Sequence, residues 1–325
     1  MTRHFLFLFC TLWLAGAVHA ESQATLSPLV YKKVQKAEKL IAEKSYTQAE
    51  QTLSALLKDV DADGLEYATI MRSLSSIHTL RGHYPMAANM LDKVVRLNVL
   101  LPEQQQEALL SLGQLWMASG QYEKAIDILE TWLKKNQPDD IQIYVLLANA
   151  HAQLHHYRQA LPYIEKAIAR SKAPKPAWYQ LNLALYYELE NYRAAAKLLQ
   201  RLIQLEQNNK DYWQQLVTVY QQLKQYPKAA AVKYLGFKKD LFNSEKDILE
   251  LSNLYLYIGA PYKSGVLLKN QIKNGGIKST SKNWETLSNA WLMAKEFDLA
   301  VEALETASQL NDNGSQETHL FKMRL

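Results

Sequence analysis

Histidine residues form the best candidate for a chemical site in this sequence. The segment His151-Ala152-Gln153-Leu154-His155-His156 places His151 and His155 four residues apart. On a helix this spacing puts two imidazoles on the same face, where they could share a metal ion. The competing interpretation, developed below, is that these histidines occupy ordinary packing and turn positions.

The short motifs that organise catalysis are missing from the rest of the sequence. It has no nucleophile elbow, no zinc-protease helix and no glycine-rich phosphate loop. Cys10 is the only cysteine, and it lies in a segment that we expect to be removed, so the mature chain has no thiol for catalysis or metal binding. We therefore predict a protein that is not an enzyme and that uses no metal and no cofactor.

Residues 1–20 have the features of a secretory signal peptide. Arg3 precedes an apolar run from Phe5 to Ala17, and Val18-His19-Ala20 resembles a small-residue cleavage site. The apolar run is shorter than the roughly 20 residues that a membrane span needs, which favours cleavage over a membrane anchor. We predict a periplasmic protein with no stable membrane insertion after cleavage.

The charge of the mature chain gives no indication of a nucleic-acid partner. Without Arg3 there remain 36 basic and 32 acidic residues, a net charge of +4, and the two signs are interspersed. A nucleic-acid-binding domain typically carries a basic patch or stripe. We therefore expect protein partners and no nucleic acid.

An aromatic residue followed three positions later by a small residue recurs along the chain. The intervals between adjacent copies are 34 to 38 residues. The copies are Tyr46 and Ala49, Tyr84 and Ala87, Tyr122 and Ala125, Tyr157 and Ala160, Tyr192 and Ala195, Tyr226 and Ala229, and Phe297 and Ala300. Ser264, after Gly259-Ala260-Pro261-Tyr262, completes a set of eight copies.

Each copy has a partner residue twelve positions upstream, and six of these eight residues are small. They are Ala37, Ser75, Gly113, Ala148, Leu183, Val217, Ser252 and Ser288. Small residues allow two helix axes to approach closely, and the intervening turn, such as Ala118-Ser119-Gly120-Gln121, separates two segments of helical period. The pattern predicts a stack of helical hairpins. It also predicts that Tyr122 packs between the two helices of its own hairpin.

The repeat supplies an alternative explanation of the histidines. His151 occupies the packing position that Trp116 holds in the preceding copy, and His155-His156 fall where that copy has Gly120-Gln121. Ordinary repeat residues therefore account for all three. No block of 100 residues outside the repeats is available for a catalytic domain, which argues against a hydrolase built on a helical scaffold.

These positions resemble the tetratricopeptide repeat over residues 29 to about 310. The clearest copy contains Leu112-Gly113, Trp116, Gly120, Tyr122 and Ala125, while Leu183, Val217 and Pro261 depart from the pattern. The resemblance implies an all-α solenoid of about eight hairpins coiled into a right-handed superhelix. We expect one solenoid over residues 21–325, with repeats near 30–62, 68–100, 106–138, 141–172, 176–208, 210–242, 245–275 and 281–311 and a further helix at 315–325.

In a repeat of this kind, one face of each first helix lines a concave groove. The corresponding residues here are amide-rich, with apolar spots and few charges, which suits an extended or helical protein segment. They are Arg72, Gln114, Met117, Asn149, Gln180, Tyr187, Gln214, Thr218, Gln221, Asn253 and Asn289. We call these eleven residues the groove row. The alternative is that they are simply solvated surface positions.

Several runs resemble a narrower family. Tyr31 to Leu57, Ala160 to Ile168, Tyr186-Tyr187-Glu188-Leu189 and Gly259 to Lys263 are similar to exported tetratricopeptide proteins encoded beside TonB, ExbB and ExbD. This resemblance implies a non-enzymatic periplasmic accessory of TonB-dependent uptake, with TonB-system proteins as partners. The alternative function is a general cell-envelope scaffold for cell-wall assembly, secretion or polysaccharide export.

Overall fold

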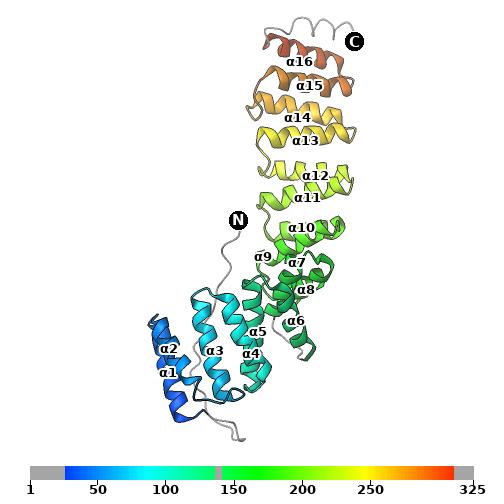
Figure 1. Ribbon diagram of the computed structural model, residues 1–325. Coiled ribbons are helices and arrows are strands. Elements are labelled where there is room, and N and C mark those ends of the chain that lie inside the picture. Colours follow the sequence, from blue (N-terminus) through cyan, green and yellow to red (C-terminus); the bar gives the residue numbers. More distant parts are fainter. Residues whose placement is uncertain (1–25, 136–140, 311–325) are drawn as a thin grey trace. The chain divides into compact units, whose positions relative to one another are not determined.

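The computed structural model describes residues 26–135 and 141–310, and these residues form helices and no strand (Figure 1). The predicted signal peptide at 1–20 and the predicted further helix at 315–325 lie outside the described residues. No described helix combines the length and hydropathy that a bilayer span requires. The helices are α1 (Pro28–Ala42), α2 (Tyr46–Leu56), α3 (Leu65–Leu80), α4 (Tyr84–Leu97), α5 (Pro102–Ala118), α6 (Tyr122–Lys135), α7 (Ile141–Gln153), α8 (Tyr157–Arg170), α9 (Pro176–Glu188), α10 (Tyr192–Leu205), α11 (Lys210–Gln222), α12 (Tyr226–Lys238), α13 (Glu245–Tyr257), α14 (Pro261–Lys273), α15 (Ser281–Met293) and α16 (Phe297–Gln309).

The helices fall into two compact units, Met1–Leu154 with α1 to α7 and His155–Leu325 with α8 to α16. In the first unit α1 packs on α2, α3 on α4 and α5 on α6; in the second, α9 packs on α10, α11 on α12, α13 on α14 and α15 on α16. Figure 1 shows α9 to α16 following one another as stacked pairs. The predicted helical hairpins are confirmed for these seven pairs, whereas α7 and α8, predicted as one hairpin near 141–172, belong to different units.

The residues twelve positions apart meet where the two helices of a hairpin cross. Three pairs make the contact through hydrogen bonds. The Ser75 hydroxyl donates to the Ala87 carbonyl oxygen at 2.9 Å, the Ser288 hydroxyl donates to the Ala300 carbonyl oxygen at 2.7 Å, and the Ser252 and Ser264 hydroxyls are 2.7 Å apart. All six residues are buried. The prediction that these positions hold the hairpins together is confirmed.

Gly113 shows how close the helices come in the copy with the most regular sequence. A Cβ added to Gly113 would lie 2.7 Å from Leu129 Cδ2 on α6. Ala125 is fully buried beside this contact, whereas Tyr122, at the start of α6, is only half-buried. Tyr122 is therefore less enclosed than a side chain wedged between the two helices would be.

The turns inside the hairpins share one backbone conformation. The residue seven positions after the small residue of the first helix always has a positive φ: Lys44, Gly82, Gly120, His155, Glu190, Lys224, Gly259 and Lys295. Gly120 has φ 73° and His155 has φ 59°. His155 thus occupies the turn position of Gly120, as the repeat predicted.

A ring on the first helix of several repeats contacts the second helix of the preceding repeat. The Tyr186 hydroxyl donates to Glu165 Oε1 at 2.5 Å, and the Gln200 amide donates to the Tyr220 hydroxyl at 2.7 Å. In the first unit His151 Nε2 lies 3.6 Å from Glu130 Oε1. His151 is buried in this packing role, so the structure agrees with its assignment to the Trp116 position.

Candidate functional site

The groove row lies on the first helices of the repeats, and none of its eleven residues is buried. Gln114, Gln180, Gln221, Asn253 and Asn289 are exposed, and the other six are half-buried. Four of the eleven belong to the first unit and seven to the second. The structure therefore leaves these side chains accessible, mostly along α9, α11, α13 and α15.

The helical period of the first helices turns the groove row away from the core, as α9 shows. On α9, Asn182 and Tyr186 are buried, whereas Gln180 is exposed and Tyr187 is half-buried. At 3.6 residues per turn, Gln180 and Tyr187 lie roughly 150° around the helix from Asn182. The helical period that directs the core residues inward thus directs the groove row outward.

Part of the groove row is already occupied by internal hydrogen bonds. The Asn149 amide donates to the Val145 carbonyl oxygen at 2.8 Å, and Gln214 Oε1 accepts from Lys233 Nζ at 2.8 Å. The exposed amides of Asn253 and Asn289 have no hydrogen-bond partner within the described parts of the chain. Gln114, Gln180 and Gln221 are exposed and free in the same way, and Asn253 and Asn289 are the two free amides that lie at one register of α13 and α15.

Exposed apolar side chains flank these amides, and sequence reasoning missed them. Tyr257 is 66% exposed and Met293 is 55% exposed, each four residues after one of the two asparagines. The Tyr226 and Tyr257 ring centroids are 4.1 Å apart. Extending the predicted row by one residue toward the turn would have found Tyr257 and Met293.

His151 and His155 of the histidine segment lie in a packing position and a turn position. His155 is exposed in its turn, and His155 Nδ1 lies 2.6 Å from the Tyr157 hydroxyl. No group of three or more histidine, cysteine, aspartate or glutamate residues in the described ranges is arranged to hold a metal ion. The described residues thus assign these histidines to packing and turn positions.

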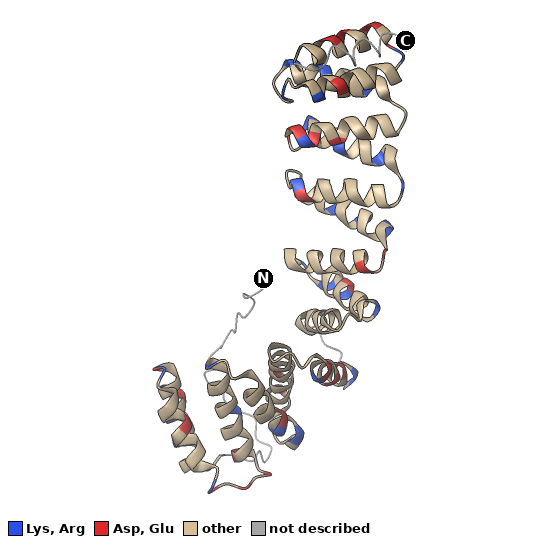
Figure 2. Ribbon diagram, turned by 45° about the horizontal axis from the view of Figure 1, so that its top comes forward, with Lys and Arg blue, Asp and Glu red and all other residues tan. Residues whose placement is uncertain are grey.

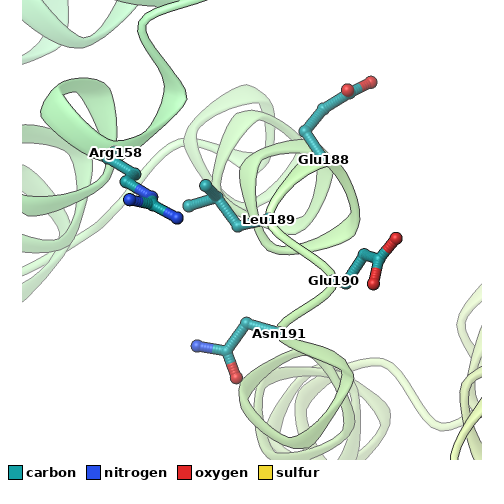
Figure 3. Close-up of a pocket in the computed structure, with 5 residues that line it drawn as sticks. All are labelled: Arg158, Glu188, Leu189, Glu190 and Asn191. Carbon is teal, nitrogen blue, oxygen red and sulfur yellow. The ribbon is translucent and has the colours of Figure 1, made fainter.

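One surface pocket of about 530 Å³ lies beside the turn between α9 and α10 (Figure 3). It is lined by Arg158, Glu188, Leu189, Glu190 and Asn191. Arg158 extends toward Leu189, while the carboxylates of Glu188 and Glu190 point away from it. The charged groups therefore do not converge on a common reacting position.

A buried charge cluster in the second unit joins α11, α12 and α13. Lys233 is fully buried, and its ammonium group donates to Gln214 Oε1 at 2.8 Å, Asp247 Oδ1 at 2.9 Å and Glu250 Oε2 at 2.8 Å. The same position holds an aliphatic residue in every other repeat: Leu53, Leu91, Leu129, Ile164, Leu199, Leu268 and Leu304. Comparing the copies at this position would have revealed the exception.

Asp247 is the centre of this cluster. Burial opposes its charged form, but hydrogen bonds from Lys210, Ser244 and Lys233 outweigh burial and hold the pKa of Asp247 well below its usual range. Lys210 Nζ lies 2.8 Å from Asp247 Oδ2, and the Ser244 hydroxyl lies 2.6 Å from the same oxygen. Because each charge has a partner, the cluster fits a structural role between neighbouring repeats.

Charges of both signs are interspersed along the helices elsewhere (Figure 2). The predicted lack of a nucleic-acid partner stays a prediction.

Comparisons with known proteins agree with the helical-repeat architecture. Residues 81–167 match the family of anaphase-promoting complex, cyclosome, subunit 3, and residues 145–211 match the tetratricopeptide repeat. No curated protein matches the sequence significantly. Residues 145–211 are therefore similar to tetratricopeptide repeats.

Solved structures with a similar arrangement have low sequence identity. A tetratricopeptide repeat protein from Parabacteroides merdae is 15% identical, covers 89% of this chain and 96% of its own, and has a TM-score of 0.47. MamA from Desulfovibrio magneticus RS-1 is 17% identical, covers 57% of this chain and 99% of its own, and also has a TM-score of 0.47. The C-terminal part of a repeat protein from Cytophaga hutchinsonii is 14% identical, covers 87% and 97%, and has a TM-score of 0.45.

Proposed function

We propose that this chain is a non-enzymatic scaffold that binds a protein segment along the groove row. The observation that carries the proposal is the pair of free, exposed amides, Asn253 and Asn289, at the same register of α13 and α15. Helical-repeat solenoids typically use such extended surfaces for binding.

The chemistry of this face suits a peptide backbone with apolar side chains. A carboxamide offers both a donor and an acceptor, so it can pair with a backbone N–H and C=O at once. Tyr257 and Met293 supply adjacent apolar area, and aromatic and methionine side chains are enriched at protein interfaces.

The double variant Asn253→Ala/Asn289→Ala tests the groove row. We expect a loss of affinity of about five- to thirtyfold for a groove ligand, because two hydrogen-bonding amides contribute about 0.5–1 kcal/mol each. Helicity and the melting temperature should stay close to wild type. The matched control is Asn270→Ala, an exposed asparagine on α14 outside the row, which should bind normally. Unchanged affinity in the double variant would place the binding site elsewhere.

We further propose that the protein works in the periplasm as an accessory of a TonB-dependent uptake system. The support comes from the signal-peptide features of residues 1–20 and from the runs that resemble the exported family. Crosslinking of the tagged full chain in cells should recover TonB, ExbB or ExbD, and deletion of the gene should slow growth on chelated iron. If neither effect occurs, the TonB assignment is wrong.

A general cell-envelope scaffold is the alternative, because the same groove row could serve another periplasmic partner. The identity of the neighbouring genes separates the two assignments. Genes for TonB, ExbB and ExbD support the first, whereas genes for cell-wall assembly, secretion or polysaccharide export support the second.

A further inference from the structure

A second pocket lies within the second unit, between α8, α9 and α10. Its volume is about 530 Å³, and its lining includes apolar side chains of Ile168 and Leu198 and the ring of Tyr179. This volume falls within the range of small-ligand sites, which is about 300–1,000 Å³. Pocket size alone does not identify a ligand, but the polar residues in this lining are more specific.

Asn182 is an exception within the repeat pattern. The residue immediately before the small position of the first helix is leucine in six of the other repeats: Leu74, Leu112, Leu147, Leu216, Leu251 and Leu287. In the first repeat it is the exposed Lys36. Asn182 is only 5% exposed, and it lines the pocket. A polar residue has therefore replaced a core leucine at the one place where this pocket forms.

The Asn182 side chain uses only part of its hydrogen-bonding capacity. It is hydrogen-bonded to Tyr186, whose hydroxyl donates to Glu165 Oε1. The Asn182 amide oxygen is buried and accepts no hydrogen bond. A buried acceptor without a partner is destabilising, so this oxygen favours a ligand that brings an N–H or O–H donor.

Positive charge dominates the lining. Lys172, Lys197 and Arg201 all line the pocket and are exposed, and none of them forms an ion pair within the described residues. The single acidic residue of the lining, Glu165, accepts the Tyr186 hydroxyl. The pocket therefore suits an anion, and the planar guanidinium of Arg201 suits a carboxylate in particular.

The pocket is separate from the groove row. Asn182, Tyr179 and Tyr186 lie within about 60° of one another around α9, whereas Gln180 and Tyr187 lie about 80–160° around the helix from them. A ligand in the pocket would therefore leave the groove row free.

We propose that this pocket binds the free C-terminal end of a protein chain. A chain end combines, within one residue, a carboxylate for Lys197 and Arg201, an N–H donor for the Asn182 oxygen and a side chain that can pack on Ile168 and Leu198. Because the Asn182 oxygen is buried, the N–H reaches it only when the amide turns toward the pocket. A leucine-like C-terminal residue fits the apolar part of the lining.

Calorimetric titration of the full chain with N-acetyl-Ala-Ala-Leu tests the proposal. We expect saturable binding, and at least about tenfold weaker binding of the same peptide with a C-terminal amide, because a charge-assisted contact is lost. Acetate and 4-methylpentanoate, which carries the carboxylate and a leucine-like chain but no N–H donor, are the comparison for a small-acid site. If either binds as tightly as the tripeptide, or if the tripeptide does not saturate, the chain-end proposal is wrong.

Two variants locate the binding in this pocket. Arg201→Gln should weaken the tripeptide about tenfold, while Arg193→Gln, an exposed arginine on α10 outside the lining, should have no effect. Asn182→Leu restores the residue of the other repeats, so it should fold and also weaken binding. Wild-type affinity in both Arg201→Gln and Asn182→Leu overturns the proposal. The groove-row variant Asn253→Ala/Asn289→Ala should bind the tripeptide normally, so the two proposals can fail independently.

Discussion

Replacing Lys233 by methionine removes the central cation of the buried cluster while keeping an unbranched side chain. The ammonium group has three hydrogen-bond acceptors, from Gln214, Asp247 and Glu250, and none of its side chain reaches solvent. Removing one partner of a buried ion pair typically costs about 3–5 kcal/mol. Asp247 keeps Lys210 and Ser244, and Glu250 is 39% exposed, so both carboxylates retain compensation. We therefore expect Lys233→Met to lower the free energy of unfolding by about 3 kcal/mol, the lower end of this range.

Thermal and urea denaturation followed by circular dichroism measure this loss. Lys238→Met is the matched control, because Lys238 is an exposed lysine on the same helix, α12. The control should unfold like wild type. If Lys233→Met and Lys238→Met unfold alike, the cluster does not stabilise the fold and the reasoning is refuted.

The same variant predicts a pH dependence. The pKa of Asp247 is lower in the folded protein than in the unfolded chain, so the stabilisation is present above the unfolded value and is lost as the pH falls toward the folded value. The unfolded pKa of aspartate is about 3.9. The difference in melting temperature between wild type and Lys233→Met should therefore be largest near neutral pH and shrink below about pH 4. A constant difference across this range would contradict the assignment to Asp247.

Two further substitutions test the hairpin geometry. Gly113→Ala should destabilise the first unit by about 1–3 kcal/mol, because the new Cβ would lie 2.7 Å from Leu129 Cδ2. The control Ser111→Ala, on the exposed face of the same helix, should unfold like wild type. Glu190→Gly should stabilise the second unit by about 0.5–1 kcal/mol, because Glu190 has φ 52°, a conformation that is strained for a residue with a Cβ and not for glycine. The control Glu107→Gly, inside α5, should destabilise the first unit by about 1 kcal/mol. Denaturation midpoints check both, and a destabilised Glu190→Gly would contradict the strain argument.

The sequence was sufficient to predict the hairpins because their packing depends on local register. Small residues twelve positions apart face each other whenever two helices are joined by a short turn, and the bonds from Ser75 to Ala87 and from Ser288 to Ala300 follow from that spacing. The turn role of His155 followed from the same register. The outward face of the first helices was equally predictable, because it is the complement of the buried face.

The polar exceptions could be located in the sequence but not interpreted there. Lys233 stands where every other repeat has an aliphatic residue, and Asn182 stands where six of the other seven repeats have leucine. Their consequences depend on which side chains of neighbouring repeats face them, and register within one hairpin does not supply this information. The partners of Lys233 lie on α11 and α13, whereas Asn182 bonds to Tyr186 on its own helix, α9, and Tyr186 in turn bonds to Glu165 on α8, so only the packed structure distinguishes the two cases.

Lys233 and Asn182 are both buried polar residues, but they differ in their hydrogen bonds. A buried group with partners fits a structural role, and a buried group without a partner fits a binding role. The charge of Lys233 is met by Asp247 and Glu250, so replacing it by the leucine of the other repeats should destabilise the fold. The Asn182 oxygen has no partner, so Asn182→Leu should raise stability by about 1 kcal/mol while weakening a ligand in the pocket. Opposite signs for the two substitutions follow from this difference in hydrogen bonding, so the stability measurement tests the buried contacts and the binding measurement on Asn182→Leu tests the ligand.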